Sequence, residues 1–319
     1  MSKNKNNKPV WSTRIKKKSS NLFTKVGSSL NIDKRLYKQD IKASTVHVEM
    51  LSKKKIPVLI LAGGYGSRLS EKTNLIPKPM IRVGDKPILH HILEIYLNQG
   101  FKQFFILGGY KCEVIMNYFR SFCGEVNELK ISNKNNSFSY EEKFEKNNFN
   151  ELYNEVTISV INTGLDTMTG GRLGRVLPLL NTDQFLLTYG DGLSNVNLNS
   201  LLERHFQTKA QVTMTVVNPS SRYGRVNLSG DRVSEFNEKP IFEENWVNAG
   251  FMVFNKNYLN NSWFNDTTNL ELDILGKISE NRDLGFYKHK GFWHCMDTLR
   301  DYNHLNKLAS SSEILPWEI

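Results

Sequence analysis

Residues 58–72 read Val-Leu-Ile-Leu-Ala-Gly-Gly-Tyr-Gly-Ser-Arg-Leu-Ser-Glu-Lys, and this stretch decides the fold class of the chain. It begins as an apolar run of strand length and then breaks into three glycines, a hydroxyl group and an arginine. A continuous apolar run of this kind is typical of a buried strand in a parallel sheet. Because Gly63, Gly64 and Gly66 lack Cβ atoms, backbone N–H groups can close around an anion, and Arg68 adds positive charge. The pattern predicts a phosphate-binding loop.

Two better-known glycine patterns do not fit this loop. A Walker A loop ends in Gly-Lys-Ser or Gly-Lys-Thr, and this loop has no such ending. A dinucleotide fingerprint that starts at Gly64 requires glycine at the position of Leu69. An ordinary turn between a strand and a helix would explain a lone glycine pair. Here the glycines are followed by Arg68 and by Lys78, which two flanking prolines hold in a stiff segment. This combination favours a loop that handles a nucleotide.

Strand and helix patterns alternate after the loop, as a parallel α/β sheet requires. The predicted strands are 58–62, 103–107, 156–161 and 185–189, and the predicted helices are 87–98, 111–122 and 172–180. Ligands of open α/β sheets bind beyond the carboxyl ends of strands, where both Gly63 and Asp191 fall. We therefore expect the glycine loop and Asp191 to face one site.

The second half of the chain contains more predicted strands than helices. The strands are 212–217, 225–228, 232–237, 247–254, 285–288 and 292–296, and a helix is predicted at 298–309. Residues 133–150 are rich in Asn, Lys and Glu, and we expect them to form an exposed excursion. The predicted fold is α/β, with a Rossmann-like, mostly parallel central sheet flanked by helices and a smaller β-rich part.

The positive charge of the chain is concentrated in residues 1–55. These residues contain fifteen Lys and Arg against three acidic residues, a formal charge of +12, so that the remainder carries −2 of the total of +10. Their Lys, Asn and Ser content predicts a disordered leader, because such a segment buries too little apolar area to fold alone. An alternative is a tether to an anionic membrane surface or to an acidic partner. Residues 56–319 are predicted to form the folded domain.

The cysteine content favours a reducing compartment. Cys112, Cys123 and Cys295 are odd in number and show no metal-binding spacing, and no apolar stretch approaches the roughly 20 residues of a membrane-spanning helix. We expect a cytoplasmic protein.

Several motifs together carry a specific resemblance. The stretch 61–69, followed by Pro77-Lys78-Pro79-Met80, resembles the signature of the sugar-1-phosphate nucleotidyltransferases. Four further segments match in the same order: Thr167-Met168-Thr169-Gly170-Gly171-Arg172-Leu173, Thr188-Tyr189-Gly190-Asp191-Gly192, Asn237-Glu238-Lys239-Pro240 and Gly291-Phe292-Trp293-His294-Cys295-Met296-Asp297-Thr298-Leu299-Arg300-Asp301. Together they are most similar to the glucose-1-phosphate cytidylyltransferases, from about residue 56 to the C-terminus. This resemblance implies a GT-A-like domain, with a nucleotide-binding half at 56–195 and a sugar-binding half at 196–319.

The resemblance implies an activity and its catalytic residues. A cytidylyl group would pass from CTP to α-D-glucose 1-phosphate, giving CDP-glucose and pyrophosphate for deoxysugar and polysaccharide biosynthesis. Phosphoryl-type transfer depends on charge neutralisation and in-line placement, which suits Arg68, Lys78 and Asp191 as catalytic residues. Mg²⁺ is typically held by one or two carboxylates together with substrate phosphates, and Asp191 and Asp297 match the metal-binding pair of the family.

The resemblance also assigns binding residues. Those for the nucleotide are Leu61, Ala62, Gly63, Gly64, Gly66, Ser67, Arg68, Lys78, Thr169, Gly170, Gly171 and Arg172. Those for the sugar phosphate are Tyr189, Gly190, Glu238, Lys239, Asn248 and Gly250. Two glycines before a helix would let the backbone approach and read a flat base. A helix-initiating turn with Thr169 as its cap is the alternative.

Other functions predict different features. The nearest rivals keep the reaction but use UTP or dTTP, or another sugar 1-phosphate. A nucleotide-sugar-dependent glycosyltransferase is expected to carry an Asp-X-Asp metal site, whereas this chain has Gly190-Asp191-Gly192. A membrane or nucleic-acid adaptor would lose its function on truncation before residue 56. We expect CTP and glucose 1-phosphate as partners, assembly into a homo-oligomer, and no nucleic-acid partner.

Overall fold

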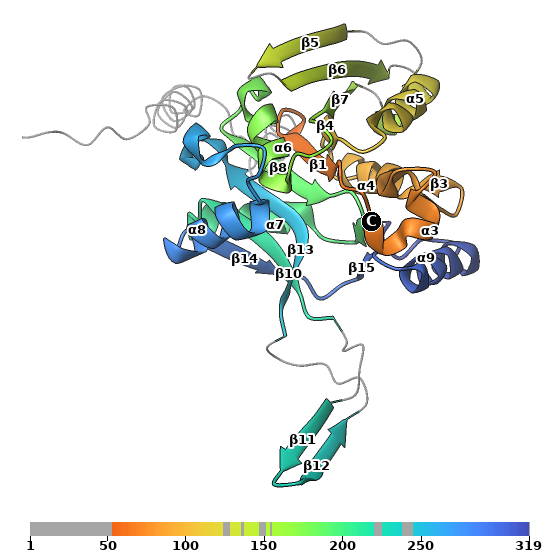
Figure 1. Ribbon diagram of the computed structural model, residues 1–319, viewed down its shortest axis with the longest axis vertical. Coiled ribbons are helices and arrows are strands. Elements are labelled where there is room, and N and C mark those ends of the chain that lie inside the picture. The colour runs from red at the N-terminus through yellow and green to blue at the C-terminus, as the bar shows by residue number, and fades with distance from the viewer. Residues whose placement is uncertain are drawn as a thin grey trace, which may run out of the picture. The chain divides into compact units, whose positions relative to one another are not determined.

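Strand β1 (Pro57–Ala62) is the central strand of a nine-stranded sheet in the described part of the chain. The computed structural model describes residues 53–123, 128–134, 137–146, 151–153, 155–219, 225–237 and 245–318. The order of the strands across the sheet is β14-β10-β13-β8-β1-β4-β7-β6-β5 (Figure 1). The predicted basic leader lies outside the described residues.

Four parallel strands form the middle of this sheet. They are β8 (Gln184–Tyr189), β1, β4 (Gln103–Gly108) and β7 (Val156–Asn162). Antiparallel β6 (Ser137–Lys146) and β5 (Glu128–Lys134) extend one side. The other side continues through antiparallel β13 (Val247–Asn255), then β10 (Val212–Val217) and β14 (Leu284–Lys288), which are parallel to each other. The predicted fold class is confirmed.

Alternate residues of β1 enter two hydrophobic cores on opposite faces of the sheet. Val58 and Ile60 pack in one core, which includes side chains of α4 (Ile88–Leu97), α5 (Cys112–Cys123), α7 (Leu198–Thr208) and α9 (Leu299–Ser311). Leu59 and Leu61 pack in the other, with α6 (Thr169–Val176), a π-helix at Leu270–Leu275 and α8 (Gly276–Glu280). These helices cover both faces of the sheet and bury β1. The position of its carboxyl end at the edge of the sheet is therefore fixed.

Shorter elements complete the described chain. Helical turns lie at Ser67–Leu69, Ser70–Thr73 (α3), Lys78–Met80, Glu151–Tyr153, Leu177–Leu179, Lys256–Tyr258 and Asn261–Trp263. Three two-stranded sheets pair β2 (Arg82–Val83) with β3 (Lys86–Pro87), β9 (Gly192–Ser194) with β15 (Trp293–Cys295), and β11 (Arg225–Ser229) with β12 (Arg232–Asn237). No helix in the described ranges is both long enough and apolar enough to cross a membrane.

Two sequence predictions need correction, and one helix was missed. Residues 133–150 were expected to form an exposed excursion, but the described part of this region belongs to β5 and β6, which extend the main sheet. The helix predicted at 172–180 begins at Thr169 and gives way to a 3-10 turn at Leu177. Helix α7 was not predicted, although its buried Leu198, Leu201, Leu202 and His205 have helical spacing.

A polar network anchors α4 within the first core. The Glu94 carboxylate accepts hydrogen bonds from Lys86 Nζ at 2.8 and 3.0 Å and from the Tyr153 hydroxyl at 2.8 Å, and His90 Nε2 lies 3.4 Å away. Burial alone would raise the pKa of Glu94, but hydrogen bonds from His90 and Lys86 outweigh it and lower the pKa to about 2. His90 is therefore explained as a buried polar side chain with hydrogen-bond partners in this network.

Candidate active site

The glycine loop leaves the carboxyl end of β1 and turns sharply at Gly66. This residue has φ of 64°, in the left-handed region, and an added Cβ would lie 2.8 Å from Thr73 Cγ2 and 3.1 Å from Lys78 Cβ. The Thr73 hydroxyl donates to the carbonyl oxygen of Gly66 at 3.2 Å. Only glycine fits this position without strain, and the tight turn leads directly to Arg68.

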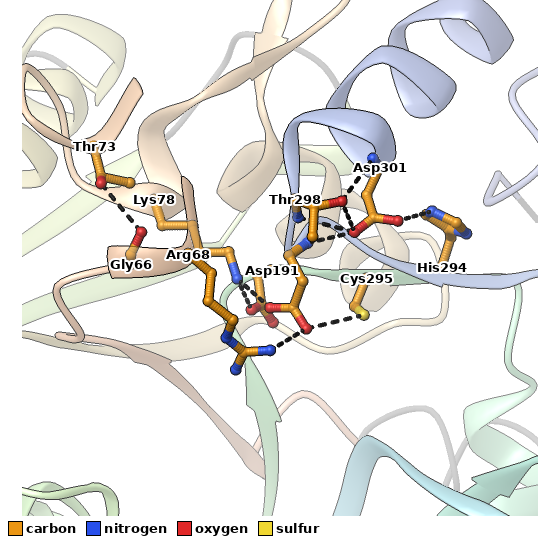
Figure 2. Close-up of polar contacts among 10 residues, drawn as sticks. Gly66, Arg68, Thr73, Lys78, Asp191, His294, Cys295, Thr298 and Asp301 are labelled. Carbon is orange, nitrogen blue, oxygen red and sulfur yellow. Dashed lines mark hydrogen bonds and ion pairs between the residues drawn. The ribbon is translucent and has the colours of Figure 1, made fainter. Parts of the chain in front are cut away.

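Lys78 lies between two carboxylates that are far apart in the sequence. Its Nζ is 2.7 Å from Asp191 Oδ2 and 2.7 Å from Asp297 Oδ1 (Figure 2). The Lys78 side chain is 13% exposed, and the carboxylate side chains are 27% and 22% exposed. The ammonium group is thus largely enclosed, and its position is fixed by two charge-assisted hydrogen bonds.

The pairing of two short strands that are distant in the sequence explains why the two carboxylates meet. Asp191 follows β8, and the N–H of Gly190 donates to the carbonyl oxygen of Leu61 at 2.9 Å, which ties this turn to the start of the glycine loop. Strand β9 then pairs with β15, placing Gly192 opposite Cys295. The N–H of Met296 donates to the carbonyl oxygen of Asp191 at 2.9 Å, so Asp297 is held beside Asp191.

The charges of this triad stabilise one another. Burial alone would lower the pKa of Lys78, but the charge and hydrogen bond of Asp191 and those of Asp297 outweigh it and raise this pKa. Burial alone would raise the pKa of Asp297, but Lys78 and then Arg68 outweigh it and lower this pKa. Near neutral pH, Lys78 is a cation and Asp297 is an anion.

The start of α9 holds Asp297 in place. Asp301 Oδ2 accepts from the N–H of Asp297 at 3.2 Å, the N–H of Thr298 at 2.9 Å and the Thr298 hydroxyl at 2.8 Å, which completes a capping box (Figure 2). Arg68 Nη1 approaches Asp297 Oδ2 at 2.9 Å, and the Arg68 side chain is 75% exposed. Asp297 is therefore held by the start of α9, and the exposed guanidinium of Arg68 pairs with it at the cavity.

A cavity of about 580 Å³ collects most of the predicted site residues. Its lining consists of Leu61, Ala62, Gly63, Gly64, Tyr65, Gly66, Ser67, Arg68, Lys78, Pro79, Leu165, Asp166, Thr167, Met168, Thr169, Arg172, Tyr189, Gly190, Asp191 and Asp297. The charged triad lies in the same cavity as the 165–169 segment and the glycine loop. A volume of this size is in the range of small-molecule sites.

Arg172 lies at the bottom of the cavity wall and is 4% exposed. Its guanidinium donates to the carbonyl oxygens of Gly63 at 3.0 Å, Gly108 at 3.0 Å and Gly164 at 2.7 Å, and to the Thr163 hydroxyl at 2.8 Å. Burial lowers the pKa of Arg172 to about 10. The side chain links the carboxyl end of β4 with the loops that follow β1 and β7, and so it supports the glycine loop.

The glycine pair of α6 lies against the chain at 265–269. An added Cβ at Gly170 would lie 2.8 Å from the carbonyl oxygen of Thr268, and one at Gly171 would lie 2.5 Å from that of Asn265. Neither glycine lines the cavity, whereas Thr169 does. The space beside both missing side chains is filled by the chain at 265–269, and contact of the Gly170–Gly171 backbone with a base stays a prediction. Thr169 is not a cap, since α6 begins at this residue and its hydroxyl donates to Glu271 Oε2 at 3.0 Å.

The predicted sugar side is partly present among the described residues. Tyr189 and Gly190 line the cavity. Asn248 Nδ2 donates to the Tyr189 hydroxyl at 3.1 Å, and Gly250, with φ of 77°, lies against the Tyr189 ring. Asn248 and Gly250 therefore do not line the cavity themselves but contact Tyr189, which does.

Two predicted site residues are not described by the structure, and two residues at the site were not predicted. Glu238 and Lys239 lie outside the described residues. Sequence reasoning missed Tyr65, whose hydroxyl donates to Asp166 at 3.0 Å across the cavity wall, and Glu271, which binds Tyr189 and Thr169. No spacing or motif marked Glu271, which stands in an unremarkable run of alternating leucines and acids.

The donor set fits a magnesium ion that substrate phosphates help to hold. Within the described ranges no three His, Cys, Asp or Glu side chains gather as a metal cluster. Mg²⁺ needs only one or two protein carboxylates when phosphates supply other ligands, and Asp191 and Asp297 converge on one point, where Lys78 Nζ contacts both. The two carboxylates therefore fit the number of protein ligands that Mg²⁺ needs when phosphates supply the others.

Comparison with known proteins decides the family. A family model described as nucleotidyl transferase matches residues 57–311. The chain belongs to the nucleotidyl transferase family. The resemblance inferred from the motifs, to sugar-1-phosphate nucleotidyltransferases and most closely to the glucose-1-phosphate cytidylyltransferases, is confirmed.

The chain matches two named relatives over nearly their full length. The chain is 35% identical to the glucose-1-phosphate cytidylyltransferase of Salmonella typhi over 261 residues, which is 82% of this chain and 98% of the relative. It is 32% identical to the probable glucose-1-phosphate cytidylyltransferase of Bacillus subtilis (strain 168), with the same coverage.

Solved structures share the fold. HddC from Yersinia pseudotuberculosis superposes with a TM-score of 0.55 at 21% identity, covering 79% of this chain and 98% of HddC. A putative glucose-1-phosphate thymidylyltransferase from Bacillus anthracis has a TM-score of 0.55 at 17% identity, covering 81% and 97% of the two chains.

Proposed function

We propose that this protein transfers a cytidylyl group from CTP to α-D-glucose 1-phosphate and releases CDP-glucose and pyrophosphate. The observation that carries the proposal is the contact of Lys78 with both Asp191 and Asp297 in the cavity that the glycine loop lines. This arrangement suits transfer at a triphosphate. The choice of cytidine and of glucose is supported by the names of relatives that are 32–35% identical over 82% of the chain.

The reaction requires one displacement. A phosphate oxygen of glucose 1-phosphate attacks the α-phosphorus of CTP, a new P–O bond forms, and the bond to the β-phosphate oxygen breaks with pyrophosphate as the leaving group. Negative charge spreads over the oxygens around the α-phosphorus and onto the leaving group. The cavity must therefore present fixed positive charge at this place.

Lys78 and Arg68 supply this charge in the proposal. Lys78 is enclosed and already ionised, so it can stabilise the transferring group with little reorganisation. The Arg68 side chain is 75% exposed, and its planar guanidinium suits two oxygens of pyrophosphate. The backbone of the loop from Gly63 to Ser67 would hold the remaining phosphate oxygens.

Asp191 and Asp297 are proposed to hold Mg²⁺. When bound, the ion would neutralise and orient the triphosphate. The residues of this chain then have separate tasks: the two carboxylates fix the position of the ion, and Lys78 remains close to both of them.

The two substrates are assigned to different walls of the cavity. The end of β1 at Leu61 and Ala62 and the segment 165–169 are proposed to enclose the nucleotide. Tyr189 and Gly190 are proposed to face the sugar phosphate, supported by Asn248 and Gly250 and joined by Glu238 and Lys239. Homo-oligomer formation, the cytoplasmic location and the division into two halves stay predictions.

One assay tests the function. Pyrophosphate release is measured with CTP, UTP, ATP and GTP, each crossed with several sugar 1-phosphates, for the full chain and for a chain that starts at residue 56. We expect release with CTP and glucose 1-phosphate in both proteins. Faster release with another pair would reassign the substrates, and loss of activity on truncation would give the basic leader an essential role.

A further inference from the structure

Glu271 joins two walls of the cavity without lining it. Its Oε1 accepts a hydrogen bond from the Tyr189 hydroxyl at 2.7 Å, and its Oε2 accepts one from the Thr169 hydroxyl at 3.0 Å. Both partners line the cavity, whereas Glu271 is not among the lining residues. Thr169 begins α6 and Tyr189 ends β8, so one carboxylate connects elements that are separate in the fold.

The glycine pair of α6 allows the segment that precedes Glu271 to pack closely against this helix. The chain at 265–269 passes so close to Gly170 and Gly171 that an added Cβ at either position would lie within 2.8 Å of its atoms. The N–H of Gly171 donates to the carbonyl oxygen of Thr268 at 3.0 Å, and the N–H of Leu270 donates to Thr169 Oγ1 at 2.9 Å. Larger residues in α6 would push away the segment that delivers Glu271.

The element that carries Glu271 is an uncommon one. Leu270–Leu275 is a π-helix, a conformation that often occurs at functional sites. Asn269 caps it through its side chain, which accepts from the N–H of Leu272 at 2.9 Å, and Leu270 and Ile274 are fully buried in the second core. The Glu271 backbone is therefore anchored on both sides, and its side chain can act as a fixed brace.

The hydroxyl of Tyr189 is fully committed to this network. It donates to Glu271 and accepts from Asn248 Nδ2 at 3.1 Å. The ring of Tyr189 is thus held in one orientation at the edge of the cavity.

We propose that Glu271 is a positioning residue that fixes Thr169 and Tyr189 relative to each other, and that Gly170 and Gly171 serve to admit it. The inference rests on the proposed function for the assignment of Thr169 to the nucleotide and Tyr189 to the sugar phosphate. Because the two walls share one carboxylate, disturbing it affects the binding of both substrates.

The test compares Glu271→Gln with Asp273→Asn in the full chain. Glutamine keeps the volume but presents an N–H₂ group to one of two hydroxyl donors. We expect KM for CTP and KM for glucose 1-phosphate each to rise about tenfold in Glu271→Gln. Asp273 lies in the same π-helix, is exposed and contacts the N–H of Asn269, so Asp273→Asn should leave both KM values within about twofold.

Amide hydrogen exchange gives a readout that does not depend on the reaction. In Glu271→Gln, the amides of Gly171 and Leu270 should exchange faster than in the wild type, since they bond across the joint between α6 and the π-helix. A wild type inactive with CTP and glucose 1-phosphate would refute the proposed function, and exchange would then decide this inference alone.

Three results would overturn the inference. They are unchanged KM values in an active Glu271→Gln, a rise in only one of the two KM values, and, where the wild type is inactive, unchanged exchange. If Glu271→Gln does not fold, Tyr189→Phe removes one of its two bonds. Tyr189→Phe must then raise the KM for CTP as well as that for the sugar phosphate, and a change in the sugar phosphate alone contradicts the coupling.

Discussion

Replacing Lys78 by methionine removes the cation that both carboxylates contact. The change keeps an unbranched side chain as far as Cε but removes Nζ and its two hydrogen bonds of 2.7 Å each, to Asp191 and Asp297. The two carboxylates then face each other with 27% and 22% of their side chains exposed. Both catalysis and folding are expected to suffer, by amounts that can be separated.

The structure sets the size of each effect. Loss of one preorganised group that stabilises transition-state charge costs about 10²–10³-fold in kcat. Breaking a fully buried pair costs about 3–5 kcal/mol, and because these carboxylates keep some water contact we expect about 2–3 kcal/mol of unfolding free energy. For a domain of this size that corresponds to a decrease in Tm of roughly 5–10 °C.

The effect of Lys78→Met on stability depends on pH. The lowered pKa of Asp297 contributes stability that is present above its ordinary value of 3.8 and is lost as pH falls through the folded pKa. The raised pKa of Lys78 contributes stability that is present below its ordinary value of 10.5 and is lost as pH rises through the folded pKa. The difference in Tm between wild type and variant should be largest between pH 3.8 and pH 10.5 and should become smaller at more acidic and at more alkaline pH.

The assays are pyrophosphate release and thermal unfolding with and without Mg²⁺. Lys54→Met is the matched control, because Lys54 pairs with Glu155 at the surface, where ion pairs contribute about 0–1 kcal/mol. In the absence of nucleotide, Mg²⁺ should raise the Tm of Lys78→Met more than that of the wild type, since two unpaired carboxylates gain most from a cation. A Lys78→Met protein with normal kcat, or with a Tm no lower than that of the control, would refute this reasoning.

Three further predictions follow from the same contacts. Asp191→Asn should lower kcat at least 100-fold in pyrophosphate release while its circular dichroism stays native, and near-normal turnover would remove Asp191 from the metal site. Glu94→Gln should lower the unfolding free energy by about 3 kcal/mol at neutral pH. In urea titrations this deficit should vanish as pH falls from 4.5 to about 2, because the stabilisation from a lowered carboxyl pKa is lost on protonation, and a pH-independent deficit would contradict the network. Gly66→Ala should lower stability by about 1–2 kcal/mol and raise the KM for CTP, because the left-handed turn and the 2.8 Å approach of Thr73 exclude a methyl group, whereas wild-type values of both would show that the turn tolerates it.

The parallel half of the fold was predictable because its signals are local. The apolar runs at β1, β4, β7 and β8 each end near the observed boundary, and the rule that ligands bind at carboxyl ends of strands brought Gly63 and Asp191 to one edge. The expectation for residues 133–150 failed because the charged residues of β6 obscure the period-two pattern of Phe138, Tyr140 and Phe144.

The closure of the site depends on contacts that are distant in the sequence. Asp297 meets Asp191 only through the pairing of two three-residue strands, β9 and β15, which no local pattern specifies. The resemblance named both acids, but the position of Lys78 between them comes from the fold. Gly170 and Gly171 show the same limit, because a missing side chain indicates close approach without saying what approaches, and here it is the segment that leads to Glu271.

Anomalous diffraction from crystals soaked with Mn²⁺ and a non-hydrolysable CTP analogue tests the central claim most directly. Mn²⁺ stands in for Mg²⁺ and is located by its own signal. The account predicts a single strong peak between the carboxylates of Asp191 and Asp297, with the α-phosphate beside Lys78 and the glycine loop around the outer phosphates. A peak elsewhere, with both carboxylates still bonded to Lys78 and the triphosphate outside this cavity, would contradict it.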